Sequence, residues 1–272
     1  MNHESPKPRL GQHFLKDTKA VRAIVKALDP VRNETIIEIG PGTGILTKAL
    51  TDTCEEKQCL VTAIEKDDSL VQSLEAHLPT NTAFISGDAL KILPKLVQSR
   101  GFAPHGYALV GNIPYYITGK LLRVISELQK KPRCVILMVQ REVAERISAK
   151  PGNMNLLAAA IQYWAKPEII MRLEPTDFSP PPEIHSAIIA LEPHKKQPDK
   201  ENKAYYVFIR HFFKQPRKTI LNNLRSGYPK LSKEELQKTL KLYNIEENGR
   251  PQDTPMPLLI KLASYFRKVG IK

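Results

Sequence analysis

The feature that most constrains the fold is a regular alternation of strand-like and helix-like segments over residues 18–191. Short β-branched runs predict seven strands, at Thr35–Ile39, Leu60–Ile64, Thr82–Ile85, Tyr107–Val110, Cys134–Val139, Glu168–Leu173 and Ala187–Leu191. Amphipathic segments between them predict helices at Thr18–Leu28, Ile45–Asp52, Ser69–Leu78, Ala89–Gln98, Gly119–Gln129, Arg141–Ala149 and Asn155–Ala165. This alternation predicts an α/β fold in which helices cover both faces of a mostly parallel sheet.

The hydrophobic pattern also predicts how the strands are placed. The first five strands are apolar throughout, so we expect them to be buried on both faces of the sheet. The last two strands follow each other without a clear helix between them. We therefore expect them to form an antiparallel hairpin at one edge.

The C-terminal part of the chain differs in both pattern and charge. The formal net charge of the chain is +13, and residues 195–272 hold 18 Lys+Arg against 7 Asp+Glu, which is +11 of that total. Before them, Glu192–Asn202 contains two prolines and no apolar side chain, which is typical of a linker. After it the pattern predicts helices only, at Ala204–Lys214, Lys218–Arg225, from the capping box Ser232-x-x-Glu235 to Tyr243, and Pro257–Val269.

These observations predict a domain at residues 1–192, a linker at 193–202 and a helical domain at 203–272. A basic field of this kind attracts polyanions, although composition alone fits a solubilising surface equally well. The N-terminal segment has no apolar stretch of the kind found in secretory signals, and no apolar run reaches the roughly 20 residues that cross a bilayer. Three cysteines in no metal-ligand spacing, Cys54, Cys59 and Cys134, predict reduced thiols in a cytoplasmic protein without a metal.

A glycine-rich loop follows the first predicted strand, in the sequence Glu38-Ile-Gly-Pro-Gly-Thr-Gly44. Glycines allow the tight turn from strand to helix and let the backbone pass close under a ligand. In an open parallel sheet, ligands bind beyond the carboxyl ends of the strands, where this loop is expected to lie. The dinucleotide pattern G-x-G-x-x-G, started at Gly40, requires a glycine at position 45, which is Ile45 here. The loop therefore argues against NAD and favours a cofactor without a pyrophosphate.

Two acidic residues end the next strands of the same predicted sheet. Glu65 ends the second strand, 21 residues after Gly44, where a carboxylate accepts hydrogen bonds from a ribose diol. Asp88 follows the third strand, where it either accepts from an adenine amino group or caps the next helix. Glu65 alone would also fit a solvated acid. Together with the glycine loop, however, the two acids describe a nucleoside-sized pocket without a phosphate clamp, which suits S-adenosylmethionine.

The fourth strand ends in Gly111-Asn-Ile-Pro-Tyr-Tyr116, which suits methyl transfer to an adenine amine. That amine is a poor nucleophile because its lone pair is delocalised into the ring. The Asn112 side-chain oxygen and a following backbone carbonyl are predicted to hold its two hydrogens, so that the lone pair points at the methyl group. Tyr115 offers a flat face to the base, and Phe178 is predicted to close the other face of a flipped base. The alternatives are a simple turn for Asn112 and an apolar anchor in a proline loop for Phe178.

Several motifs in chain order resemble the ribosomal RNA adenine dimethyltransferases, and most closely the bacterial branch that acts on small-subunit 16S RNA. They are Gly11-Gln-His-Phe-Leu15, Glu38-x-Gly-Pro-Gly-Thr-Gly44, Gly87-Asp-Ala-Leu90, Asn112-Ile-Pro-Tyr115, Val139-Gln-Arg-Glu-Val-Ala-Glu-Arg146 and Phe178-x-Pro-Pro-Pro182. In the helical part, Gln215-Pro-Arg-Lys-Thr-Ile-Leu-Asn-Asn-Leu224 is similar to a motif of that branch. The resemblance runs from about Leu10 to Phe266.

The resemblance implies a Rossmann-like, S-adenosylmethionine-dependent methyltransferase sheet with a small all-helical C-terminal domain. It implies that two adjacent adenosines in the 3′-terminal hairpin loop of 16S rRNA, within the small ribosomal subunit, are each dimethylated on N6 during subunit biogenesis. Motif matching places cofactor contacts at His13, Leu15, Gly40, Glu65, Asp88 and Asn112. Reasoning from the residues alone reaches the last four of these but neither His13 nor Leu15.

The chain departs from the family pattern at three places. Position 13 is often asparagine in the family and is histidine here, and the segment Ala149–Asn155 and Pro216 differ from the usual residues. The last two departures affect the loops expected to face RNA, where Lys214, Arg217 and Lys218 are predicted to contact phosphates.

Two other functions remain compatible with the sequence. One is an RNA-binding ribosome-assembly or transcription factor of the same fold, in which methylation is secondary. The other is a methyltransferase for DNA or a small molecule. The leading expectation is a monomeric cytoplasmic enzyme that acts on rRNA and has no contact with a membrane.

Overall fold

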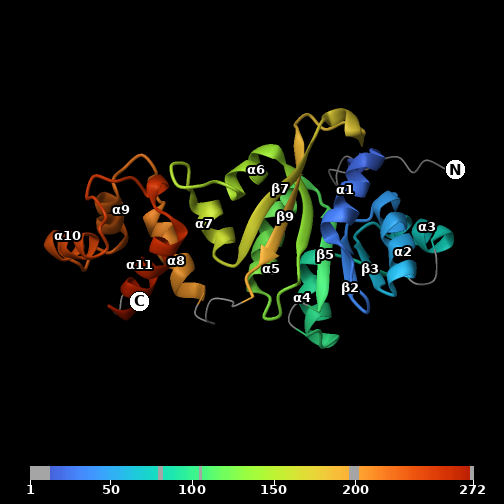
Figure 1. Ribbon diagram of the computed structural model, residues 1–272, viewed down its shortest axis with the longest axis horizontal. Helices are drawn as coiled ribbons and strands as arrows, with labels where there is room; N and C mark the ends of the chain where they lie inside the picture. Colours follow the sequence, from blue (N-terminus) through green and yellow to red (C-terminus); the bar gives the residue numbers. More distant parts are fainter. Residues whose placement is uncertain (1–12, 79–81, 104–105, 196–201, 270–272) are drawn as a thin grey trace. The chain divides into compact units, whose positions relative to one another are not determined.

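The computed structural model describes residues 13–78, 82–103, 106–195 and 202–269 (Figure 1). The chain divides into two compact units, one formed by 1–144 with 167–193 and the other by 145–166 with 194–272. Residues 145–166 therefore group with the helical unit rather than with the sheet, which differs from the expected boundary after residue 192. The physical reason is packing, because Met154, Ala158, Ala159 and Tyr163 lie in the apolar core of the helical unit. Most of the predicted linker, 196–201, lies outside the described residues.

The first unit is built on a seven-stranded sheet in the order β4-β3-β2-β5-β6-β9-β7. The strands are β2 (Thr35–Ile39), β3 (Leu60–Glu65), β4 (Thr82–Ser86), β5 (Tyr107–Asn112), β6 (Val135–Gln140), β7 (Ala165–Leu173) and β9 (Ser186–Pro193). The pairs from β4 to β6 are parallel and β9 is antiparallel to β6, so the predicted mostly parallel sheet is confirmed. The His194 N–H donates to the Trp164 carbonyl at 2.9 Å, joining the end of β9 to the start of β7. The expected antiparallel hairpin at the sheet edge is therefore present.

Burial along the strands follows their position in the sheet. Every residue of β2 is buried, and so is every residue of β5 except the last, because both strands lie in the middle of the sheet. The expectation that the first five strands are all buried is wrong for β4, whose side chains are only partly buried or exposed. As the edge strand, β4 has a neighbour on one side only.

The helices of the chain lie close to the predicted segments (Figure 1). They are α1 (Thr18–Leu28), α2 (Ile45–Lys57), α3 (Asp68–His77), α4 (Ala89–Ser99), α5 (Thr118–Glu127), α6 (Arg141–Ile147), α7 (Leu156–Gln162), α8 (Asn202–Phe212), α9 (Ile220–Gly227), α10 (Lys233–Leu242) and α11 (Met256–Lys268). The apolar side of α1 packs with α2 in one core beneath the sheet, together with Ile36, Val61 and Ala108. Asp17 caps α1 by accepting from the Lys19 N–H at 2.9 Å.

A short two-stranded sheet holds the N-terminal segment against residues 178–179. Hydrophobic periodicity does not predict this sheet. The strand β1 (Phe14–Leu15) pairs antiparallel with β8 (Phe178–Ser179), and Leu15 lies opposite Phe178. Strands of two residues carry no alternation, so the sequence shows no signal for this pairing. Its consequence is that residues far apart in the chain meet beside the carboxyl ends of the central strands.

The second unit has its own aromatic core, to which α8 contributes Tyr205, Phe208 and Phe212, and α11 contributes Phe266. The predicted capping box is confirmed, because the Ser232 hydroxyl accepts from the Glu235 N–H at 3.1 Å and the Glu235 carboxylate accepts from the Ser232 N–H at 2.7 Å. Within the described ranges, no helix is both long enough and apolar enough to span a membrane.

The cysteines differ in part from the expected reduced thiols. Cys54 and Cys59 are joined by a disulfide, whereas Cys134 is free and buried. The pair meets because the chain reverses at Gln58, which has a φ of 56°, so that the end of α2 comes back beside the start of β3 and the two Cα atoms lie 4.6 Å apart.

Candidate active site

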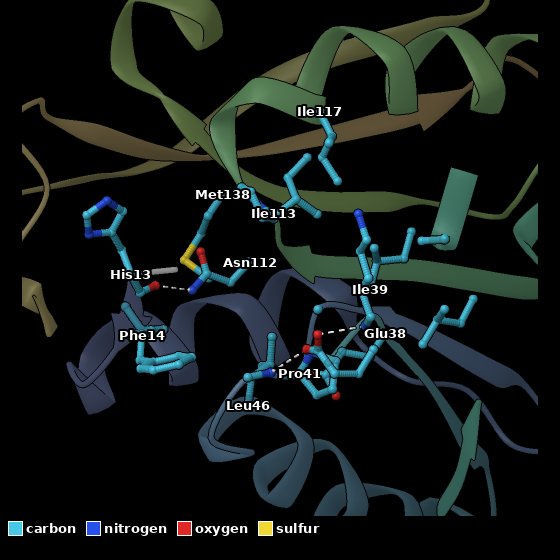
Figure 2. A pocket seen from close by; sticks show the side chains of 18 of the residues that line it. His13, Phe14, Glu38, Ile39, Pro41, Leu46, Asn112, Ile113, Ile117 and Met138 are labelled. Atoms are coloured by element: carbon cyan, nitrogen blue, oxygen red, sulfur yellow. Dashed lines mark hydrogen bonds between the residues drawn. The ribbon is translucent and has the colours of Figure 1, made fainter. Parts of the chain in front are cut away.

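A cavity of about 270 Å³ lies where β2, β3 and β5 end, and it brings together most of the predicted site residues. Figure 2 shows it from close by, with His13 and Asn112 labelled among them. Its wall includes seven of the eight residues predicted from the sequence: His13, Leu15, Gly40, Glu65, Asp88, Asn112 and Tyr115. This is the edge at which parallel α/β sheets bind ligands. A nucleoside with a short side chain is the size of ligand that such a cavity accepts.

The glycine loop passes under the cavity in a backbone conformation that residues with side chains rarely adopt. Gly40 has a φ of 70°, and a Cβ atom there would lie 3.2 Å from the backbone oxygen of Asn112. Gly42 has a φ of 58°, and its Cβ would lie 2.9 Å from the ring of Phe14. The missing side chains therefore let the loop lie close to the end of β5 at Gly40 and close to the Phe14 ring at Gly42.

The two acids at the strand ends differ in how they are held. The Glu65 carboxylate is buried and accepts from the backbone N–H groups of Gly42, Lys66 and Asp67, at 3.3, 2.7 and 3.0 Å. Asp88 caps α4 through one oxygen, which accepts from the Leu90 N–H at 2.9 Å. Its other oxygen has no hydrogen-bond partner among the residues that the structure describes. Asp88 thus combines the helix-capping alternative with a position on the cavity wall.

Asn112 is fixed by the N-terminal segment. Its Nδ2 donates to the backbone oxygen of His13 at 2.9 Å, across a separation of 99 residues (Figure 2). Because the amide nitrogen is used in this way, the amide oxygen is left without a protein partner in the described part of the chain. An acceptor is thus held ready at the cavity, as the predicted role requires.

His13 has a structural role that its sequence context did not reveal. Its backbone orients Asn112, its Nδ1 contacts the Pro180 carbonyl at 2.8 Å, and its ring lies nearly parallel to that of Tyr115 with centroids 6.2 Å apart. The residues Gly11 and Gln12 of the same motif lie outside the described residues. A residue that acts through its backbone oxygen leaves no trace in the pattern of residue types, so only the family resemblance pointed to it.

Tyr115 is held in place at the start of a short 3-10 helix, η2 (Tyr115–Ile117). Its hydroxyl shares a hydrogen bond with Ser186 at 2.5 Å, and burial raises the pKa of this phenol. The ring is therefore neutral at physiological pH and fixed at the cavity wall, as a stacking face requires.

The structure corrects the role predicted for Phe178. Its ring is 1% exposed, packs in the core with Leu15 and Ile24, and does not line the cavity. Pairing of β8 with β1 directs this side chain into the core, where it acts as the apolar anchor that the sequence left as the alternative. In this conformation it cannot close the second face of a base.

Glu38 is a site residue that the sequence reasoning noted but gave no role. It lines the cavity, is 1% exposed, and its Oε2 is buried without a hydrogen-bond partner. Burial raises its pKa to about 8, and the nearby charge of Glu65 adds to the effect. A buried carboxyl group with one unpartnered oxygen beside a ligand cavity fits a cationic group of the ligand, such as the ammonium or sulfonium of S-adenosylmethionine. No group of three or more potential metal ligands occurs within the described ranges.

The chain is similar to known proteins over nearly its whole length. The chain matches the family described as "Ribosomal RNA adenine dimethylase" over residues 3–268. It is 35% identical over 270 residues to the "Ribosomal RNA small subunit methyltransferase A" of Mesomycoplasma hyopneumoniae (strain 232), covering 98% of each chain. It is also 35% identical over 248 residues to the protein of the same name from Alkaliphilus metalliredigens, covering 89% of this chain and 85% of that one.

Solved structures share the fold at lower identity. A dimethyladenosine transferase from Plasmodium falciparum superposes with a TM-score of 0.78 at 23% identity and covers 95% of this chain and 99% of that chain. The 23S rRNA methyltransferase ErmE superposes with a TM-score of 0.69 at 22% identity and covers 92% and 98%. The expected Rossmann-like methyltransferase sheet is thereby confirmed. From its matched length and its full-length relatives, the chain belongs to the ribosomal RNA adenine dimethylase family.

Proposed function

We propose that this chain transfers methyl groups from S-adenosylmethionine to N6 of two adjacent adenosines in the 3′-terminal hairpin loop of 16S rRNA. Each adenosine receives two methyl groups, and the substrate is the small ribosomal subunit during its assembly in the cytoplasm. The observation that carries the proposal is the Asn112 amide, whose nitrogen is bound by His13 while its oxygen stays free at the cavity. The names of the full-length relatives, which refer to the small ribosomal subunit, support the choice of RNA.

The donor is assigned to the part of the cavity formed by the strand ends. S-Adenosylmethionine, when bound, supplies a methyl group activated by a cationic sulfur. Gly40 lets the donor approach the backbone, Glu65 accepts from its ribose hydroxyls, and Asp88 accepts from its adenine amine. Leu15 and the backbone at His13 close the same wall. Glu38 lies where its carboxylate would balance the positive charge of the donor.

The acceptor adenine is assigned to the side of Asn112 and Tyr115. In the first transfer the Asn112 oxygen and a backbone carbonyl of the Ile113–Pro114 turn accept the two N6 hydrogens, and in the second transfer one of these acceptors holds the single remaining hydrogen. Both arrangements direct the nitrogen lone pair toward the methyl carbon. The ring of Tyr115 supports the base from one face. As the new N–C bond forms and the S–C bond breaks, one N6 proton is released to water. Asn112 thus lowers the barrier by orientation rather than by deprotonating the amine.

The test is methyl transfer to undermethylated small subunits with a labelled donor, followed by mapping of the product. Asn112→Ala is expected to lower kcat by roughly 100-fold or more while RNA binding persists. Gln98→Ala removes an exposed amide on α4, away from the cavity, and is the matched control. Methylation of duplex DNA in place of RNA, or no dimethyladenosine in the 3′ hairpin, would contradict the proposal.

The same variant separates the enzyme from a binding factor. If a strain that lacks the native enzyme is fully rescued by Asn112→Ala, including its subunit assembly, RNA binding rather than methylation is the principal function. Under the proposed function, Asn112→Ala does not rescue methylation, and the most that it rescues is subunit assembly. Light scattering of the purified protein tests the proposed monomeric state.

A further inference from the structure

Two side chains at the cavity wall have no part in the proposed chemistry. Tyr116 is 59% exposed although it carries a large aromatic ring, and Lys120 is exposed one helical turn later. Both residues line the same cavity as Asn112 and Tyr115. An exposed tyrosine ring contributes little to the core, and at a ligand cavity its apolar face is open to a bound group.

The two neighbouring tyrosines are held differently. Tyr115 is partly buried, bound to Ser186 and parallel to His13, whereas Tyr116 has no hydrogen bond or ring contact within the described residues. Successive side chains in a helical turn point in different directions. A base supported by Tyr115 therefore leaves the ring of Tyr116 free for a second, different base.

Lys120 follows Tyr116 by four residues and lines the same cavity. Residues four apart on a helix project from the same face, and α5 continues directly from η2. Lys120 has no ion pair among the described residues, whereas Arg123 in the following turn pairs with Glu127 at 2.9 Å. The turn nearest the cavity thus presents an aromatic face together with an uncompensated cation. This combination binds a nucleobase and its phosphate.

We propose that Tyr116 and Lys120 form a platform for the nucleotide next to the adenosine that is being methylated. The ring stacks on the base of that nucleotide, and the ammonium contacts its phosphate. Extruding the target adenosine costs the stacking of its neighbour, and the platform replaces this lost contact. The inference rests on the proposed RNA substrate and adds a second base-binding position that the chemistry itself does not require.

The platform is tested by equilibrium binding of a synthetic RNA hairpin with the 3′-terminal sequence, measured by fluorescence anisotropy. Two further RNAs each keep one adenosine of the pair as the sole target. In the first RNA the nucleotide 5′ of this adenosine is abasic, and in the second RNA the nucleotide 3′ of it is abasic. Wild-type protein is expected to bind one abasic RNA roughly 5- to 100-fold more weakly than the intact RNA. Tyr116→Leu is expected to show the same loss on intact RNA and no further loss on that abasic RNA. Tyr116→Phe keeps the ring and is expected to restore binding.

Salt dependence tests the cation separately. Lys120→Gln is expected to make the negative slope of log K against log salt shallower by about 0.7, the value for one phosphate contact to a single strand. Lys91→Gln removes an exposed lysine of α4 that does not line the cavity and is expected to leave the slope unchanged.

Two results would overturn the platform: wild-type affinity of Tyr116→Leu for intact RNA, or an equal further loss of that variant on both abasic RNAs. Calorimetric titration with S-adenosylmethionine shows whether Tyr116→Leu is folded with an intact donor site. These experiments measure RNA binding without methyl transfer, so they test the platform even if wild-type protein methylates no adenosine. That last result would instead contradict the proposed function.

Discussion

At the scale of single residues, the cavity contains a buried acid whose charge we expect to depend on the ligand. Glu38 is buried with an unpartnered oxygen, and burial raises its pKa to about 8 from 4.5. Below pH 8 the empty protein therefore holds a neutral carboxylic acid at this position. Binding of a net cationic donor favours the charged form and lowers this pKa.

This coupling predicts a pH dependence of donor affinity. We expect the Kd of wild-type protein for S-adenosylmethionine to fall as the pH rises from about 6.5 to 8.5, because less work is needed to ionise Glu38. Glu38→Gln should flatten the profile, and the difference between the two proteins removes the titration of the donor's own amino group. Isothermal calorimetry in buffers of different ionisation enthalpy measures the released proton. Equal proton release by both proteins would contradict the coupling.

The raised pKa of Glu38 also predicts how the free energy of unfolding of the ligand-free protein changes with pH. The folded state keeps the Glu38 proton up to a pH of about 8, whereas the unfolded chain loses it near 4.5. The contribution of this group to the free energy of unfolding is therefore present below pH 4.5 and is lost as the pH rises toward 8. Urea denaturation of wild type and Glu38→Gln at pH 5 and pH 8 checks this, and a larger loss in the variant would be inconsistent with it.

At the scale of elements, Arg133 ties three segments of the sheet domain together. Its guanidinium donates to both oxygens of Glu34, at 2.8 and 2.9 Å, and to the Leu28 carbonyl at the end of α1, at 2.7 Å. The Glu34 side chain is only 2% exposed, whereas Arg133 is 31% exposed. A buried carboxylate that loses its partner is costly, so this clamp fixes the connection between α1, β2 and β6.

Removing the arginine should therefore destabilise the protein. We expect Arg133→Met to lower the free energy of unfolding by about 3 kcal/mol, the lower end of the range for breaking a buried pair, because Arg133 is partly exposed. Adding Glu34→Gln to this variant should recover part of the loss by removing the buried charge. Urea denaturation of both single variants and the double variant gives the coupling. Purely additive effects would show that the pair does not act as a clamp.

Close approach of two strands explains why β5 needs a glycine immediately before Asn112. A Cβ at Gly111 would lie 2.5 Å from the backbone oxygen of Ile39 in β2, a contact that only a backbone shift relieves. We expect Gly111→Ala to cost about 1–3 kcal/mol of stability and to weaken S-adenosylmethionine binding by displacing Asn112. Gly119→Ala is the control, because nothing lies within 4 Å of its Cβ position. Thermal unfolding and calorimetry compare the two variants.

At the scale of the whole molecule, charge is divided unevenly along the chain. Residues 195–272 carry +11 of the net +13, and in that part Arg217, Lys218 and Arg225 surround one concave surface at the start of α9. Long-range attraction of RNA and sequence-independent phosphate contacts are properties of such a surface. Residues 1–194, by contrast, carry only +2 of the net charge.

The plot of log K against log salt for 16S hairpin RNA has a negative slope. Replacing these three cations by glutamine should make this slope shallower by about 2. The charge-matched control replaces Lys233, Lys238 and Lys241 of α10, which do not line this surface. Donor binding, measured by calorimetry, should not change in either variant. A similar change of slope in both variants would show that overall charge rather than this surface determines RNA affinity.

The sequence by itself determined the alternation of strands and helices, the glycine loop and the acids at the strand ends. These features depend on local backbone geometry and on hydrophobic periodicity, and both are determined by residues that are close together in the sequence. Accordingly, α1 and β2 have the bounds that the sequence predicts, and Gly40, Glu65, Asp88 and Asn112 line one cavity.

Only the tertiary structure decided which way Phe178 points, how His13 positions Asn112, and that residues 145–166 join the helical unit. Each of these outcomes depends on contacts between segments that are distant in the chain, such as the pairing of β1 with β8. Residue types fix what a side chain is able to do, but the packing of remote segments fixes whether it faces the core or the cavity.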